Sequence, residues 1–187
     1  MKNMTISQKN ASGFTLIELM VGIAILAILA GLAVPAFSTW APNYRLKNAS
    51  SDLYSNIQAA RMRAIQNGAD YAIIFDTGGS SYYMANDPGG DTTWGTADDE
   101  RDETVNLSDY GSNVQFGSGS AWNDWKGDAI VADGVSYSNN RVVFTSRGMS
   151  GAGTVFLDHV NNDRAYAVTT TIAGAARLRQ FLNGGWE

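Results

Sequence analysis

The sequence predicts an α+β protein in which one long helix precedes a series of antiparallel strands. Three observations lead to this prediction. Residues 14–37 are strongly apolar, an apolar stripe at helical spacing continues to Ala64, and after Gly68 short apolar runs alternate with a period of two. The chain has 187 residues, which suits one globular domain with an attached element.

The apolar segment, residues 14–37, is long enough to cross a membrane. As a helix it would extend about 36 Å, against about 30 Å for the hydrocarbon core of a bilayer. The preceding residues 1–13 contain two lysines and no acid, so the positive-inside tendency places them in the cytoplasm and the rest of the chain outside. A secretory signal has its small-residue cleavage site after the apolar run, whereas here Gly13 precedes it. Glu18 is the only charged residue of the segment, and a lone carboxylate in lipid is costly unless it is paired.

The second half of the helix is expected over residues 38–67. Its apolar residues recur at three- and four-residue steps and predict one buried stripe, formed by Leu46, Ala49, Leu53, Ile57, Ala60 and Ala64. The Asn67-Gly68 pair is a natural C-terminal stop. Pro35 lacks a backbone donor and is expected to kink the helix or open it locally.

Residues 68–187 are expected to form a β-rich globular domain. A hairpin turn at Asp76-Thr77-Gly78-Gly79 separates the first two strands. The predicted strands are 71–75, 81–85, 103–107, 113–116, 128–132, 141–145, 153–158, 164–172 and 177–182. No second long helix is expected.

The composition narrows the range of functions. The chain has no cysteine, which rules out disulfides and thiolate metal sites. Its single histidine, His159, argues against histidine-based catalysis. No serine lies in a Gly-x-Ser-x-Gly motif. The net charge of −5 argues against a dedicated nucleic-acid binder. We therefore expect that the protein is not an enzyme. An enzyme tethered to the membrane by an N-terminal anchor is the least favoured alternative.

The stretch Gly13-Phe14-Thr15-Leu16-Ile17-Glu18-Leu19 resembles the class III signal of type IV prepilins and type II secretion pseudopilins. The resemblance implies a pilin-like fold and cleavage of the leader, residues 1–13, by a prepilin peptidase between Gly13 and Phe14. It also implies methylation of the new amino terminus at Phe14. Glu18 and Pro35 stand where the family has its conserved acid and proline, and in the family's usual account the acid pairs with the amino terminus of a neighbouring subunit.

Three further features resemble the GspH/FimT-type minor pilins and pseudopilins: the hairpin directly after the helix, the strand–turn–strand pattern of residues 142–157 and the closing segment 169–181. This resemblance implies a structural subunit that joins, primes or caps a type II secretion pseudopilus or a type IV pilus. The implied partners are the prepilin peptidase, other pilins or pseudopilins and the inner-membrane assembly platform. The implied location is the inner membrane, with a single pass, a cytoplasmic N-terminus and a periplasmic C-terminal domain, and then the filament. The alternative function is a pilus-tip module that captures DNA or a surface, and another kind of minor pilin remains an alternative family.

Two charged features carry candidate binding sites. Seven acidic residues fall between residues 87 and 103, and we expect a solvated acidic loop; if the loop binds Ca²⁺, the ligands are Asp87, Asp91, Asp98 and Asp99. Arg177 and Arg179 alternate on one predicted strand and so face the same way. DNA-binding relatives carry Gly-Arg-x-Arg near the C-terminus, but here the first arginine is absent, so we expect a solvated or subunit-contact face.

The loop tryptophans Trp94, Trp122 and Trp125 have two interpretations. Exposed aromatic side chains in loops contact partners, whereas buried ones anchor the loop to the domain. The sequence leaves both interpretations open.

Overall fold

The computed structural model describes residues 13–160 and 164–187, without the side chains of residues 33–39. The chain divides into two compact units, residues 1–39 and residues 40–187. One helix, α1 (Leu16–Asn67), runs from the first unit into the second. Its backbone is helical through Pro35 and Pro42, so neither proline ends the helix. The leader residues 1–12 and the side chain of Pro35 lie outside the described residues.

The first unit contains the start of α1 and its apolar side chains. From Phe14 to Leu32 each large apolar side chain is at least 50% exposed. The sequence predicts a membrane-spanning segment here, but among the residues that the structure describes no helix is long and apolar enough to cross a membrane.

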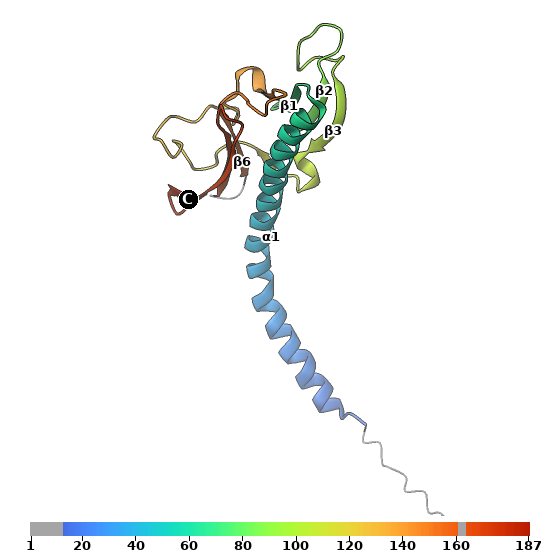
Figure 1. The fold of residues 1–187 in the computed structure, drawn as a ribbon. Coiled ribbons are helices and arrows are strands. Elements are labelled where there is room, and N and C mark those ends of the chain that lie inside the picture. The colour runs from blue at the N-terminus through green and yellow to red at the C-terminus, as the bar shows by residue number, and fades with distance from the viewer. Residues whose placement is uncertain (1–12, 161–163) are drawn as a thin grey trace, which may run out of the picture. The chain divides into compact units, whose positions relative to one another are not determined.

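The second unit contains the rest of α1 and two antiparallel sheets, which lie on either side of the helix (Figure 1). The first sheet has the order β3-β2-β1-β5, with bounds β1 (Tyr71–Asp76), β2 (Ser81–Asp87), β3 (Glu100–Asn106) and β5 (Arg141–Phe144). The second has the order β4-β6-β7-β8-β9, with bounds β4 (Val114–Phe116), β6 (Gly153–His159), β7 (Ala165–Thr170), β8 (Ala176–Leu182) and β9 (Gly185–Trp186). Two short 3₁₀ turns, η1 (Leu107–Asp109) and η2 (Ser138–Asn140), lie in the connections.

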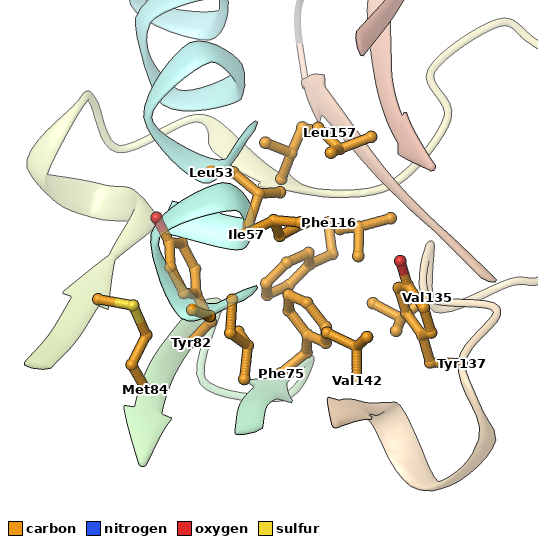
Figure 2. Packing of buried hydrophobic residues seen from close by; sticks show 14 of the residues in the cluster. Leu53, Ile57, Phe75, Tyr82, Met84, Phe116, Val135, Tyr137, Val142 and Leu157 are labelled. Atoms are coloured by element: carbon orange, nitrogen blue, oxygen red, sulfur yellow. The ribbon is translucent and has the colours of Figure 1, made fainter. Parts of the chain in front are cut away.

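The predicted apolar stripe of α1 is buried along its whole length and lies between the sheets. Every member from Leu46 to Ala64 is at most 1% exposed. Figure 2 shows Leu53 and Ile57 pointing from the helix into a cluster that also contains Phe75 of β1 and Leu157 of β6. The ring of Phe75 stacks on Tyr137 at a centroid distance of 5.8 Å, which joins the first sheet to the segment before β5. One face of the helix therefore packs against residues of both sheets in one shared core.

The predicted end of α1 is confirmed, and an ionic contact fixes it to the first sheet. Gly68 follows the helix with a φ of +64°, the left-handed conformation that favours glycine at this position. Arg63 Nη1 donates a hydrogen bond of 2.6 Å to the hydroxyl of Tyr71 and lies 3.4 Å from the carboxylate of Asp102. Burial, together with the hydrogen bond to Asp102, raises the pKa of Tyr71 to about 12. The C-terminal part of α1 is thus held to β1 and β3.

The hairpin prediction is confirmed, because Asp76 of β1 pairs with Ser81 of β2 across the predicted turn. The prediction of a strand over residues 128–132 is wrong. There the structure has only an isolated bridge between Asn123 and Ala129. The Asp124 carboxylate accepts hydrogen bonds from the backbone of Lys126 and Asp128, at 2.8 and 3.0 Å, and so holds a tight local turn that does not join a sheet.

Two long loops cover the outer faces of the sheets, which α1 does not reach. On the first sheet Trp94 packs against a small cluster that includes Ile74 and Tyr83. On the second sheet the ring of Trp125 lies 6.5 Å from that of Phe156. Each sheet is therefore packed on both faces, by the helix on one and by a tryptophan-bearing loop on the other.

Candidate functional site

The start of α1 is stabilised by a reciprocal contact between Thr15 and Glu18. The backbone N–H and the hydroxyl of Thr15 each donate a hydrogen bond of 2.9 Å to Glu18 Oε2. The backbone N–H of Glu18 donates in return to the Thr15 hydroxyl, at 3.3 Å. This is a capping box, which satisfies backbone donors that have no partner in the first helical turn. This local role of Glu18 is not among the predictions from sequence, although the Thr-x-x-Glu spacing is a recognised signal for it.

Gly13 and Phe14 lie just before the capping box. A methyl group built at Gly13 would have no atom within 4 Å, and the residue does not have a positive φ. Phe14 is 90% exposed. The fold of the chain therefore does not require a glycine at position 13, and a requirement for a small residue there has to come from another molecule.

The four calcium candidates lie at the end of β2 and in the loop that follows it, and three of their carboxylates accept hydrogen bonds from neighbouring residues of this segment. Asp87 accepts a hydrogen bond from the backbone of Gly89 at 2.8 Å, and Asp91 accepts one from that of Thr93 at 2.7 Å. Asp98 accepts one from the hydroxyl of Thr96 at 2.6 Å, which lowers the pKa of Asp98. Within the described ranges, no three His, Cys, Asp or Glu residues are arranged to hold a metal ion. Calcium binding by this loop stays an untested alternative to the solvated loop that the sequence predicts.

Asp99 differs from the other three because it is buried and connects the loop to the first sheet. Its carboxylate accepts hydrogen bonds from the Tyr83 hydroxyl at 2.8 Å and from the backbone of Gly95 at 2.9 Å. Burial and this bond raise the pKa of Tyr83 to about 12. The guanidinium of Arg101 lies 4.1 Å from the centre of the Tyr83 ring, and Arg141 donates to the carbonyl of Trp94. The acidic loop is therefore an anchored cover of the first sheet.

The two candidate DNA-binding arginines lie on β8 with different surroundings. Arg177 is exposed. The guanidinium of Arg179 lies 4.7 Å from the centre of the Trp125 ring, a cation–π contact that holds the covering loop of the second sheet. Two arginines on an acidic chain would contact few phosphates. DNA binding stays an untested alternative to the predicted solvated or subunit-contact face. His159, the one histidine, is buried in β6.

Arg61 has a role that its place in the sequence does not reveal. Its Nε donates a hydrogen bond of 3.0 Å to the carbonyl of Gly148, between β5 and β6. Its Nη2 donates a hydrogen bond of 3.2 Å to the carbonyl of Ala173, between β7 and β8. Gly174 has a φ of +74°, and a methyl group there would collide with the Gly148 carbonyl. One helical side chain thus joins the turns of segments 142–157 and 169–181. No local pattern predicts this contact, because its members are far apart in sequence.

Comparison with known protein families gives two matches. Residues 8–34 match the prokaryotic N-terminal methylation motif, and residues 49–174, more than half of the chain, match the type II transport protein GspH. No curated protein matches the chain.

Solved structures of similar fold include minor pseudopilins and a minor pilin. The minor pseudopilin EpsH of the Vibrio cholerae type 2 secretion system is 14% identical, with a TM-score of 0.50, over 72% of this chain and 95% of that chain. A crystal structure of EpsH from the same organism gives 20% identity and a TM-score of 0.48, over 72% of this chain and 92% of that chain. The type IV minor pilin FimU of Pseudomonas aeruginosa is 12% identical, with a TM-score of 0.49, over 73% of this chain and 89% of that chain. The first of these supports the predicted pilin-like α+β fold.

Proposed function

Because the chain belongs to the type II transport protein GspH family, we propose that it is a minor pilin or pseudopilin that joins, primes or caps a filament. The filament is a type II secretion pseudopilus or a type IV pilus. The observation that carries the proposal is the position of the methylation motif, residues 8–34. This motif includes the start of the same helix whose second half packs against both sheets of the GspH-type domain.

The apolar start of α1 supports assembly through this helix. Burying one large apolar side chain is worth about 1.5–3 kcal/mol, so a row of exposed ones is stable only in lipid or against other helices. In this proposal the segment 14–37 anchors the precursor in the inner membrane, with the leader 1–13 in the cytoplasm and the globular domain in the periplasm. The prepilin peptidase then cuts after Gly13 and methylates Phe14.

Glu18 supplies the specificity of the assembly step. A carboxylate among apolar helices is tolerated when a cation neutralises it, and the amino terminus of a neighbouring subunit is such a cation. An unpaired partner would leave a buried charge, so a misplaced subunit is disfavoured. The proposal gives the protein no catalytic activity.

Crosslinking in cells tests the proposal. The chain contains no cysteine, so a single Leu19→Cys substitution gives a unique crosslinking site on the apolar half of α1. We expect disulfide or bismaleimide crosslinks to other pilins or pseudopilins that carry an engineered cysteine in their own apolar helix, whereas Thr92→Cys, in the acidic loop, serves as the control for random collisions. A Leu19→Cys protein that crosslinks no more often than the control, while remaining in the membrane, would contradict the proposal.

Deletion of the gene separates the two kinds of filament. A type II secretion role predicts loss of secreted proteins with normal surface pili, and a type IV pilus role predicts the reverse. Reintroducing the wild-type chain should restore whichever is lost.

A further inference from the structure

A groove beside the β8–β9 hairpin has an unusual lining. It has a volume of about 480 Å³ and is lined by four aromatic side chains, Trp122, Trp125, Phe181 and Trp186, together with glycines and short polar residues such as Asn123 and Asp124. None of the described residues that line it carries an aliphatic side chain. Flat apolar faces therefore alternate with hydrogen-bonding groups.

The floor of this groove is held in place by ring contacts around Trp186. The Trp186 ring lies 5.3 Å from that of Phe181 and 6.0 Å from that of Trp125, at steep angles to both. Its indole N–H donates a hydrogen bond of 2.8 Å to the carbonyl of Asn123. Arg179 covers one face of Trp125. Because these rings are already fixed, a ligand would not have to order them on binding.

Trp122 stands at the edge of this floor and is 88% exposed. Its backbone is nevertheless ordered, since the Trp122 carbonyl accepts a hydrogen bond of 3.4 Å from Ile130, and the Asp124 N–H donates one of 2.8 Å to Asp128. A large aromatic side chain held in water by an ordered backbone, next to a groove of further aromatics, is typical of a binding surface.

We propose that this groove binds a neutral saccharide chain. The C–H face of a pyranose ring stacks on an indole, and its hydroxyls are donors and acceptors for short side chains such as those of Asn123 and Asp124. An apolar peptide partner would be met by aliphatic side chains, which the lining lacks. A polyanion is disfavoured by Asp124 and by the net charge of −5. This binding activity goes beyond the proposed role in the filament.

Calorimetric titration of the full chain, in a detergent without a sugar head group, tests the proposal. The probes are chitohexaose, cellohexaose and maltohexaose, with hexalysine as a cationic probe. We expect at least one saccharide to bind, and Trp122→Ala to weaken that binding about tenfold, the loss of one aromatic stacking face. Trp122→Phe should give an intermediate loss. Trp40→Ala is the matched control, because Trp40 is also exposed, at 56%, but lies on α1 outside the groove.

Three results would overturn the saccharide site: no binding of any saccharide probe to the wild type, equal binding by the folded Trp122→Ala variant, or Trp122-dependent binding of hexalysine in their place. Thermal melts show whether each variant is folded. Trp122→Ala should join the filament like the wild type. The filament role and the saccharide site can therefore fail independently. If Trp122→Ala binds saccharide as well as the wild type but no longer assembles, the groove is a contact between subunits and not a saccharide site.

Discussion

Glu18 accepts two hydrogen bonds from Thr15, one from its backbone and one from its hydroxyl, both 2.9 Å long. The same carboxylate is proposed to pair with the amino terminus of a neighbouring subunit. It therefore has a local role, in starting α1, and an intermolecular role, in assembly. Substitutions at the two positions separate these roles, because only Glu18 carries the charge.

Glu18→Gln should keep the helix start but lose assembly. A glutamine in a capping box still accepts hydrogen bonds, but it cannot neutralise an amine. Thr15→Ala should do the opposite, fraying the first turn while subunits still assemble. Glu18→Leu loses both roles, and cleavage after Gly13 should persist in all three variants. Crosslinking to filament subunits is the readout. If Glu18→Gln enters the filament as often as the wild type, the Glu18 charge has no role in pairing with a neighbouring subunit.

Gly13→Val should block processing without affecting the fold. Position 13 has free space around it, so the added side chain causes no collision, and the peptidase is the component expected to reject it. Intact mass should show loss of residues 1–13 and one added methyl group on Phe14 in the wild type, and the full precursor in the variant. Gly22→Ala, where there is also free space, is the control and should be processed. A mature wild-type chain that still begins at Met1 would refute the cleavage site.

Calcium should not stabilise the globular domain more than magnesium does. The carboxylates of Asp87, Asp91 and Asp98 accept hydrogen bonds from neighbouring residues of the loop, and an ion would have to compete with these. A bound ion would raise the melting temperature by mass action. The comparison is a thermal melt of the full chain with millimolar Ca²⁺ or Mg²⁺. A rise specific to Ca²⁺, abolished by Asp98→Ala, would establish a calcium site.

Gly174→Ala should be more destabilising than Gly184→Ala. Both glycines have a positive φ, which costs an alanine about 1–2 kcal/mol. Only at Gly174 would the methyl group also meet the Gly148 carbonyl and the guanidinium of Arg61. This overpacking should add about 1–3 kcal/mol. Urea unfolding of the two variants measures the difference, and equal midpoints would mean that the turns move apart freely.

Stability should fall as the pH rises from about 10 to about 12. Burial raises the pKa values of Tyr82 and Tyr137 to about 12, whereas the unfolded chain loses these protons near the ordinary value of 10. The folded state therefore holds more protons in this window, so the stabilisation is complete below pH 10 and is lost progressively between pH 10 and pH 12. Each tyrosine contributes a slope of up to about 1.4 kcal/mol per pH unit.

Tyr137→Phe is the variant for this alkaline test, since it removes one of the tyrosines whose pKa the fold raises. Urea midpoints between pH 8 and pH 12 should decline less steeply for it than for the wild type. Tyr44→Phe, at an exposed position, should leave the decline unchanged. An unchanged slope in Tyr137→Phe would show that this hydroxyl does not drive the alkaline loss.

The sequence by itself determined the features that depend on local periodicity. The stripe from Leu46 to Ala64 is buried as predicted, because residues at three- and four-residue steps share one face of a helix whatever packs against them. The hairpin at residues 76–79 and the end of α1 at Gly68 follow in the same way from turn chemistry. The motif at Gly13 and Glu18 is likewise visible in a few adjacent residues, and so is the capping box once Thr15 is read with Glu18.

The tertiary structure decided what depends on contacts between distant residues. Strand periodicity does not reveal that β5 joins the first sheet and β6 the second, since pairing is a choice among partners and not a local property. The same reason explains the loop tryptophans: Trp94 and Trp125 became anchors because a sheet face lay opposite them, and Trp122 stayed exposed. Arg61 donates hydrogen bonds to two carbonyls that lie 87 and 112 residues away in the sequence, in turns that only folding brings to the helix.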